Sequence, residues 1–459
     1  MSIIKSYMVP HPPLIIPDIG KGNERDIQKT IDSYEQIAKE IAKLKPETII
    51  ISSPHTTLYS DYFHITPGKV VTGDLSQFGA SNIKFEELLD EELINEIDSI
   101  CKKNKFPAGK TESIPLDHGT MIPLYFIKKY YNDFKLVVIG LSGLPLIDNY
   151  KMGTLIKEAV NKRNKKVVFI ASGDLSHKLQ NYGPYGFAKE GPEYDKKIME
   201  VCSNANFKEL LYFEESFLDK AAECGHRSFT IMAGTFDGLN VEAEKLSHED
   251  ITGVGYGVCT FTPKEKNNDR KLIEKYLNNQ KEIINSKRRN EDSYIKLARQ
   301  TIEEYMRTGN TPKLSDNIDK ELLNNKSGVF VSIHKFGSLR GCIGTILPIY
   351  NSLAEEIIQN AISASTKDDR FIPITKEELD FLEIKVDVIK EPELISSKDE
   401  LDVKKYGVIV SSGYKRGLLL PDLDGIDTID QQISIAMKKG NITKNEIITL
   451  ERFEVIRHQ

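Results

Sequence analysis

Histidine residues occur in the first 260 residues at places where an apolar run has just ended or a loop begins. His11 follows SYMVP, His55 follows IIISSP, and His177 follows VVFIASGDLS. His118 lies in the segment SIPLDHGT, and His226 lies in AECGHRS. Imidazole nitrogens bind transition metals and, because their ordinary pKa is near neutrality, also serve in acid–base catalysis. The pattern therefore predicts a metal site or an acid–base site.

The apolar runs before these histidines are typical of buried strands. SIIKSYMV, ETIIISS, KLVVIGLS and KKVVFIAS alternate with helical segments such as residues 25–44 and FEELLDEELINEIDSICKKN. In open α/β sheets the carboxyl ends of the strands form the ligand crevice, so loops from different strands can meet in one small volume. We expect residues 1–262 to form an α/β domain, with a mostly parallel central sheet flanked by helices.

A single histidine after a strand is more often an ordinary hydrogen-bonded side chain than a ligand. Prolines strengthen the case for two of them, in Pro10-His11-Pro12 and in Pro54-His55. A proline beside a ligand restricts the backbone where the strand ends, so less conformational freedom is lost on coordination. Histidines that share one structural position therefore favour a common site.

The composition changes after residue 262. Residues 263–289 are dense in both charge signs and lack strand signals, which indicates a charged linker that is partly helical. From residue 290 a helix, SYIKLARQTIEEYMRTG, precedes the strands GVFVSIHKFG and LRGCIGTIL, which a hairpin at Gly337 and Ser338 joins. A second helix and further alternating strands follow. We expect residues 290–459 to form a smaller α+β domain with a mixed or antiparallel sheet.

The bulk composition excludes several classes of function. The net charge of -6 gives no basic footprint for nucleic acid. No segment approaches the ~18 to 20 apolar residues that span a bilayer. The five cysteines never form a CxxC pair, so neither a disulfide framework nor an iron–sulfur cluster is indicated. We expect a cytoplasmic protein with reduced thiols.

The ordered motifs of the first domain resemble a known family. PHPPLIIPDIGKG, SSPH, LDHG, ASGDLSHK and AAECGHRS together look like the LigB-type class III extradiol dioxygenase superfamily, and within it the bacterial Memo-like branch. The resemblance implies that His11 and His55 are metal ligands and that His177 is an acid–base residue. It places His118 beside the substrate. It also implies iron(II), with zinc or copper as alternatives, and a small catechol-like substrate.

The third ligand is where this sequence leaves two alternatives. Dioxygenases of the family use a glutamate in this region, Memo-like proteins have a cysteine before glycine, and here Glu223 and Cys224 are adjacent. Two histidines with a carboxylate suit non-haem iron(II). Two histidines with a thiolate favour zinc, copper(I) or a redox role for iron. Asp174 either orients His177 or simply forms a turn after Gly173.

The second domain resembles the AMMECR domain over nearly its full length. The matching segments are SYIKLARQTIEEY, GVFVSIHKFGSLRGCIGT, DDRF, ELDFLEIKVDVIKEPE and GYKRGLLLP. Fusion of this domain to a Memo-like domain looks like the AmmeMemoRadiSam arrangement, which implies a radical SAM protein as a partner. The sequence lacks a CxxxCxxC motif, so that partner would be a separate protein.

Three functions are compatible with these patterns. The first is an iron(II) oxidoreductase of the extradiol type, the second is a metal-binding accessory protein for a radical SAM enzyme, and the third is a zinc-dependent hydrolase. A second candidate site lies in LRGCIGT, where Arg340 would lower the thiol pKa of Cys342 or hold an anion. The alternative is that Cys342 is a small buried residue in a strand that glycines distort. Arg370 is either an ion-paired structural residue or an anion contact.

Overall fold

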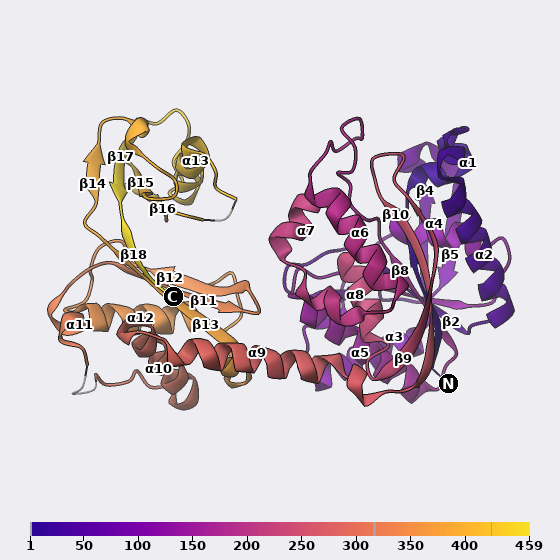
Figure 1. Ribbon diagram of the computed structural model, residues 1–459, viewed down its shortest axis with the longest axis horizontal. Coiled ribbons are helices and arrows are strands. Elements are labelled where there is room, and N and C mark those ends of the chain that lie inside the picture. Colours follow the sequence, from indigo (N-terminus) through magenta and orange to yellow (C-terminus); the bar gives the residue numbers. More distant parts are fainter. Residues whose placement is uncertain (1, 315–317, 424) are drawn as a thin grey trace. The chain divides into compact units, whose positions relative to one another are not determined.

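The computed structural model describes residues 2–314, 318–423 and 425–459. The chain divides into two compact units, Met1–Tyr276 and Leu277–Gln459. The division lies inside helix α9 (Leu272–Arg289), labelled in Figure 1. The segment expected to be a linker therefore contains this helix and the end of strand β10 (Tyr256–Lys266).

The first unit is built on one eight-stranded sheet with the strand order β6-β3-β7-β2-β8-β1-β10-β9. The four central strands run parallel, β10 and β9 run antiparallel at one edge, and β3 pairs antiparallel with β7 near the other. The α/β architecture predicted from the apolar runs is thus confirmed, with a parallel centre in a mixed sheet. The remaining strands are β1 (Ile3–Val9), β2 (Thr48–Ser53), β3 (Phe63–Ile65), β6 (Ala108–Lys110), β7 (Lys135–Gly140), β8 (Val167–Ser172) and β9 (Leu239–Glu249).

The register of the central strands explains why the site forms at one edge. Every residue of β2 and of β8 is buried, as their unbroken apolar sequences predict. Val9, the last residue of β1, pairs with Ser172, the last residue of β8. Ser53, the last residue of β2, pairs with Gly140 at the end of β7. The loops that carry His11 and His55 therefore leave the sheet at the same level.

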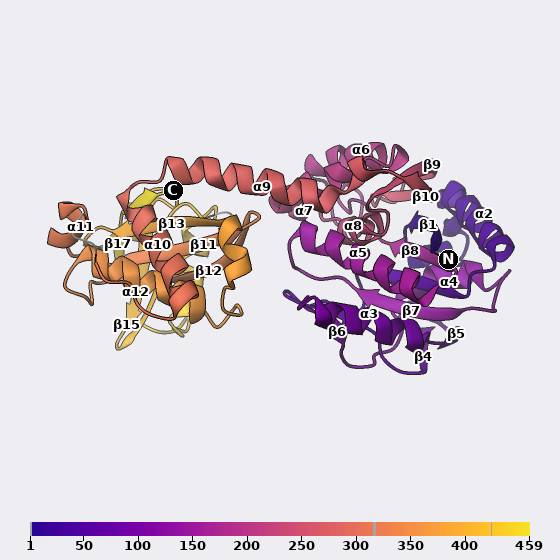
Figure 2. The same ribbon diagram turned by 90° about the horizontal axis from the view of Figure 1, so that it is seen from below.

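Helices cover both faces of this sheet, as Figures 1 and 2 show. Helices α2 and α4 pack against each other on one face, and α3, α5 and α8 form a layer on the other. The α5–α8 contact is so close that a Cβ at Gly153 would lie 1.9 Å from the carbonyl oxygen of Ile231. The helices are α1 (Pro17–Gly20), α2 (Gln28–Leu44), α3 (Glu91–Lys103), α4 (His118–Ile127), α5 (Leu146–Arg163), α6 (Glu190–Ser203), α7 (Glu215–Ala221) and α8 (His226–Gly234).

A two-stranded hairpin of β4 (Val70–Leu75) and β5 (Ala80–Leu88) corrects one expectation. The segment FEELL was expected to begin a helix, but residues 85–88 belong to β5. Phe85 and Glu87 are buried while Glu86 and Leu88 are exposed, which is the period of two that a half-buried strand requires. The helix begins only at α3, where the side chain of Asp90 accepts the backbone N–H of Leu93.

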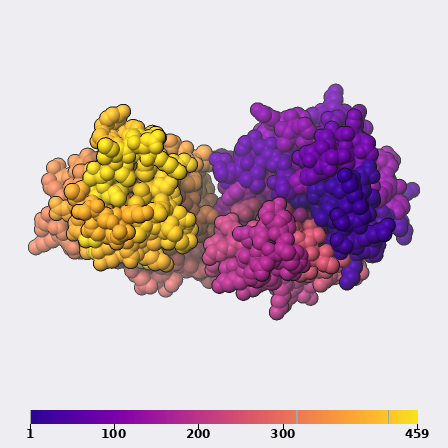
Figure 3. All heavy atoms as spheres, turned by 90° about the horizontal axis from the view of Figure 1, so that it is seen from above, coloured from indigo at the N-terminus to yellow at the C-terminus, as the bar shows by residue number. Residues whose placement is uncertain are grey.

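The second unit contains two four-stranded antiparallel sheets, with the orders β12-β11-β13-β18 and β14-β17-β15-β16. The predicted hairpin joins β11 to β12 through Phe336 and Gly337, whose positive φ angles of 53° and 83° make the tight turn. Residues near the C-terminus, yellow in Figure 3, lie at the surface of this unit. Its strands are β11 (Val329–Lys335), β12 (Ser338–Gly344), β13 (Leu382–Ile389), β14 (Glu393–Ile395), β15 (Gly407–Ser412), β16 (Lys415–Leu419), β17 (Thr449–Phe453) and β18 (Val455–His458).

Helices α10 (Ser293–Thr308) and α12 (Leu353–Thr366) pack on the first of these sheets around a core of aliphatic side chains. Helix α13 (Ile429–Lys439) packs on the second sheet, and α11 (Lys320–Asn324) contacts α12. The smaller α+β domain predicted from the sequence is therefore present. Among the described residues, we find no helix with the length and apolar character needed to cross a membrane.

Candidate metal centre

Three histidine rings contact one another at the carboxyl edge of the parallel strands. His11 follows β1, His55 follows β2, and His118 is the first residue of α4. The ring centroids of His55 and His118 are 4.1 Å apart, and that of His11 lies 4.7 Å from His55 and 5.3 Å from His118. The Nε2 atoms of His11 and His55 are 2.9 Å apart. The loops thus converge as the positions of the strand ends predict.

His11 is held in the tautomer that a metal ligand needs. The hydroxyl of Ser172 donates to the carbonyl oxygen of Gly119 over 2.6 Å, so a lone pair of that hydroxyl is free to accept from Nδ1–H of His11 over 2.9 Å. A proton on Nδ1 leaves Nε2 of a neutral imidazole as an acceptor. The His11 side chain is 1% exposed. His11 therefore presents a ligand nitrogen toward His55.

Cys224 and Asp174 both lie close to Nε2 of His11. The Sγ atom of Cys224 is 3.6 Å from Nε2 of His11, and Oδ2 of Asp174 is 3.9 Å from it. The other oxygen of Asp174 accepts the backbone N–H of His11 over 2.7 Å, and the backbone N–H of Asp174 donates to Sγ of Cys224 over 3.2 Å. The candidate ligand atoms form two groups that share His11, one with His55 and His118 and one with Asp174 and Cys224.

Glu223 has a different task, although its sequence position made it an equal candidate for the third ligand. Its carboxylate accepts the backbone N–H of His226 over 2.5 Å and so satisfies the first turn of α8. Burial raises the pKa of Glu223 to about 7, and the hydrogen bond from His226 opposes that rise. Glu223 is in neither group of candidate ligands among the residues that the structure describes. The geometry favours Cys224, because the glutamate is used to cap a helix.

His177 lies near the cluster and has an unpartnered nitrogen. Its Nε2 atom is buried and has no hydrogen-bond partner in the described part of the chain. Burial, followed by the nearby His55, lowers the pKa of His177 to about 4, so the ring is neutral near pH 7. The ring of Tyr185 stacks on it, with 5.1 Å between centroids. A neutral imidazole with a free nitrogen can accept a proton from a bound molecule.

Burial governs protonation throughout the cluster. It lowers the pKa of His11 well below the ordinary value, and the neighbouring histidines add to that effect. It lowers the pKa of His118 to about 4. Burial also raises the pKa of Asp174 to about 7 and that of the Cys224 thiol well above its ordinary value. These groups therefore prefer their neutral forms until a cation is bound beside them.

The residues fit a metal ion. Two nitrogens that each lie about 2.0 to 2.1 Å from one ion are roughly 2.9 to 3.4 Å apart, which includes the separation seen between His11 and His55. Ser172 supplies the outer hydrogen bond that metal-binding histidines almost always have. The imidazoles and the Cys224 thiol together form a donor set for iron, copper or zinc.

A hollow of about 870 Å³ opens beside His55 and His118. The β4–β5 hairpin contributes Lys84 and Phe85 to its lining, and Phe78 in the hairpin turn contacts the ring of His118 with 5.2 Å between centroids. Most of the other lining residues are polar or charged. Two of the three clustered histidines, His55 and His118, therefore border this hollow.

Other residues singled out from the sequence lie away from the cluster. His226 is fully buried, and its Nε2 donates to the carbonyl oxygen of Leu210 over 2.9 Å. In the second unit Arg340 pairs with the carboxylate of Glu378 through Nε and Nη2, over 3.0 and 3.1 Å. Arg340 also donates to the carbonyl oxygen of Ile372. These contacts occupy the guanidinium of Arg340, and the positive charge that lowers the pKa of the Cys342 thiol comes from Arg370.

Several supporting residues were missed from the sequence. Ser172 orients His11, and Asp117 accepts from Ser53 over 2.5 Å and caps α4 through the backbone N–H of Thr120. Tyr185 covers His177. A serine at the end of an otherwise apolar strand was a usable signal for Ser172. The contacts of Asp117 with Ser53 and of Tyr185 with His177 depend on how the chain folds, so the sequence carries no signal for them.

The comparisons with known proteins agree with the fold. Residues 5–259 match the family described as the catalytic LigB subunit of aromatic ring-opening dioxygenase, and residues 295–458 match the AMMECR1 family. The first match covers more than half of the chain. The protein belongs to the LigB family and carries an AMMECR1 domain fused to its C-terminal side.

Relatives cover the chain in whole or in part. Protein CA_C1420 of Clostridium acetobutylicum is 40% identical over 469 residues, covering 100% of both chains. A protein of Thermotoga maritima is 46% identical over 160 residues, which is 34% of this chain and 92% of that one. The crystal structure of uncharacterized protein PH0010 from Pyrococcus horikoshii is 31% identical and covers 36% of this chain and 88% of its own, with a TM-score of 0.34.

Proposed function

We propose that the first unit is a mononuclear iron(II)-dependent oxidoreductase of the class III extradiol type that acts on a small catechol-like or related molecule. His11, His55 and Cys224 would hold the metal. Zinc or copper would suit the same donors, so metal analysis decides among the three. Bound iron(II) would supply the redox chemistry with oxygen and substrate.

The observation that carries this proposal is the orientation of His11. Its Nε2 is the acceptor nitrogen, because Nδ1 keeps its proton and donates it in a hydrogen bond to the hydroxyl oxygen of Ser172. That nitrogen lies 2.9 Å from Nε2 of His55 and 3.6 Å from Sγ of Cys224. The imidazole of His55 and the thiol of Cys224, which both lie close to Nε2 of His11, are donors that suit iron, copper or zinc.

The other residues of the site have roles that follow from their positions. His177, with its unpartnered Nε2, would take a hydroxyl proton from the bound molecule. His118 belongs to the cluster and also lines the hollow, where it would hydrogen-bond the substrate. Tyr185 covers His177 and would limit the access of water.

Oxygen consumption by the iron-loaded, anaerobically purified protein tests the activity directly. We expect at least one member of a panel of substituted catechols to stimulate oxygen uptake and to give a ring-opened product. His177→Asn should abolish the uptake and retain iron. His64→Asn provides a matched control, because His64 is a buried histidine that hydrogen-bonds Thr66 outside the cluster. Uptake that survives in His177→Asn would contradict the proposed role.

A second function has its own support. The cysteine rather than the glutamate reaches His11, and an AMMECR1 domain is fused to the LigB domain. Both features suit a metal-binding accessory protein for a radical SAM enzyme. Co-purification of such an enzyme with the tagged full chain, together with stimulation of its turnover, would favour this function. Ring-opening activity without any such partner would favour the first one.

A further inference from the structure

One short loop, residues 173–177, connects the two sides of the metal centre. The side chain of Asp174 accepts the backbone N–H of His11, and the backbone N–H of Asp174 donates to Sγ of Cys224. His177, at the other end of the loop, has an unpartnered buried Nε2 and lies near His55 and His11. The position of this loop therefore sets the position of a candidate ligand and of the acid–base residue together.

The loop is anchored by a carboxylate from outside the centre. Asp195 in α6 is 3% exposed, and its Oδ1 accepts the backbone N–H of Ser176 over 2.9 Å. Its Oδ2 accepts from Nε2 of His248 in β9 over 3.0 Å. A Cβ built on Gly255 would lie 2.0 Å from that Oδ2, so the carboxylate fits against bare backbone. Gly255 in turn pairs with Leu175 and Ser176 through two backbone hydrogen bonds.

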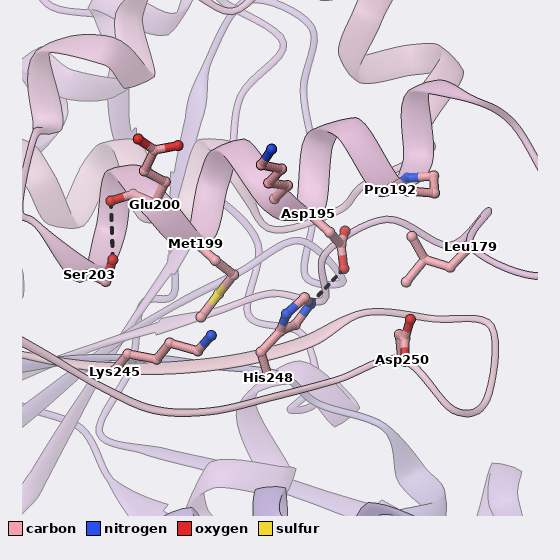
Figure 4. Close-up of a pocket in the computed structure, with 10 residues that line it drawn as sticks. Leu179, Pro192, Asp195, Met199, Glu200, Ser203, Lys245, His248 and Asp250 are labelled. Carbon is pink, nitrogen blue, oxygen red and sulfur yellow. Dashed lines mark hydrogen bonds and ion pairs between the residues drawn. The ribbon is translucent and has the colours of Figure 1, made fainter.

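His248 reaches Asp195 from a separate hollow. Figure 4 shows the imidazole of His248 and the carboxylate of Asp195 directed toward each other, with Met199 and Lys245 nearby. The hollow measures about 380 Å³, and the His248 side chain is 25% exposed. Burial raises the pKa of Asp195, and the hydrogen bonds from His248 and Ser176 oppose that rise. Without the N–H of His248, the buried carboxylate would favour its neutral form and would bind the Ser176 amide less strongly.

We propose that Asp195, oriented by His248, is a positioning residue for the metal centre. It holds the Ser176 amide and thereby sets the loop that places Asp174 against His11 and Cys224 and places His177 against the substrate. The expected effect of Asp195 on metal binding rests on the proposed function. The anchoring of the loop by Asp195 does not depend on any metal. A merely structural tie between α6 and β9 would not alter the metal centre.

The test uses the full chain and Co²⁺ as a spectroscopic probe. Asp195→Ala should weaken Co²⁺ binding by about 10-fold or more, as loss of an outer support typically does. It should also change the absorption bands of the Cys224–Co²⁺ centre. In the metal-free protein it should accelerate amide hydrogen exchange at Ser176 and His177. Asp90→Ala is the matched control, because Asp90 is an equally buried carboxylate that caps α3 away from the loop.

A pair of conservative variants keeps the proposal falsifiable if Asp195→Ala does not fold. His248→Gln retains an N–H that can donate to Asp195, so its affinity for Co²⁺ should stay near that of the wild type. His248→Leu has no such donor, and its affinity for Co²⁺ should fall. Equal Co²⁺ affinity and equal exchange at Ser176 in His248→Gln and His248→Leu would overturn the proposal. If the wild type binds no Co²⁺, the metal centre fails, and faster exchange at Ser176 in His248→Leu would still support the anchoring.

Discussion

The hydroxyl oxygen of Ser172 lies 2.9 Å from Nδ1 of His11. Because that hydroxyl donates its own proton to Gly119, it can only accept from His11, and the imidazole must carry its proton on Nδ1. Ser172, at the end of β8, therefore determines which nitrogen of His11, in the loop after β1, is available for coordination. The parallel pairing of these two strands makes the contact possible.

Loss of the Ser172 hydroxyl should loosen the metal. Ser172→Ala removes the acceptor of Nδ1–H, so we expect the affinity for Fe²⁺ or Co²⁺ to fall by about 10- to 100-fold with little change in secondary structure. Metal titration followed by absorption measures the effect. Ser33→Ala is a suitable control, since Ser33 is also buried and bonds to Ser247 and Lys29 in another part of the unit. An unchanged metal affinity in Ser172→Ala would contradict the inference that Ser172 prepares His11 for coordination.

The stability of the first unit should depend on Asp90 in acid. Burial alone would raise the pKa of Asp90, but hydrogen bonds from Lys165, Thr48 and the amide of Leu93 lower it overall. A carboxylate whose folded pKa lies below its unfolded value of about 3.9 stabilises the fold above that pH, and this stabilisation is lost as the pH falls through the folded pKa.

Asp90→Asn should therefore destabilise the protein by about 3 kcal/mol at pH 7, because Lys165 loses its buried partner. The difference from wild type should narrow steadily below pH 4. Thermal midpoints of both proteins between pH 3 and pH 7 measure the trend, with the exposed Asp61→Asn as the control. A difference that stays constant across this range would contradict the assigned pKa direction.

The thiol of Cys342 should react slowly. Burial raises its pKa, while the hydroxyl of Ser332, 3.2 Å from Sγ, and the charge of Arg370 oppose that rise. Arg370→Gln should slow alkylation by iodoacetamide at pH 8 by about twofold or more, because the thiolate loses a nearby positive charge. Arg340→Gln should leave the rate unchanged, since Arg340 pairs with Glu378. Peptide mass spectrometry measures both rates, and a slower reaction in Arg340→Gln alone would contradict this assignment.

The general architecture was predictable because it depends on local patterns. Unbroken apolar runs mark the buried parallel strands, and the loops after them carry His11 and His55 to one edge. The segment FEELL was misjudged because its residues favour helices, whereas pairing with β4 and burial of Phe85 make it a strand. Tertiary contact overrode local preference there.

The choice between Glu223 and Cys224 could not be made from the sequence. Adjacent residues at a helix start face different surroundings, and only the position of α8 decides which one meets His11. The support from Asp195 could not be predicted either, because Asp195 lies in a different element from the loop that it holds. Sequence patterns predict where the histidines meet, and the packing of the loops determines which side chains lie beside them.

The metal content of anaerobically purified protein, compared among wild type, Cys224→Ala and Glu223→Gln, tests the central claim most directly. Glutamine at position 223 retains an oxygen that can accept the amide of His226, so the helix cap is preserved. The geometry predicts that Cys224→Ala loses the metal or its thiolate spectrum and that Glu223→Gln retains both. Loss of metal in Glu223→Gln, with full retention in Cys224→Ala, would contradict the ligand set proposed here.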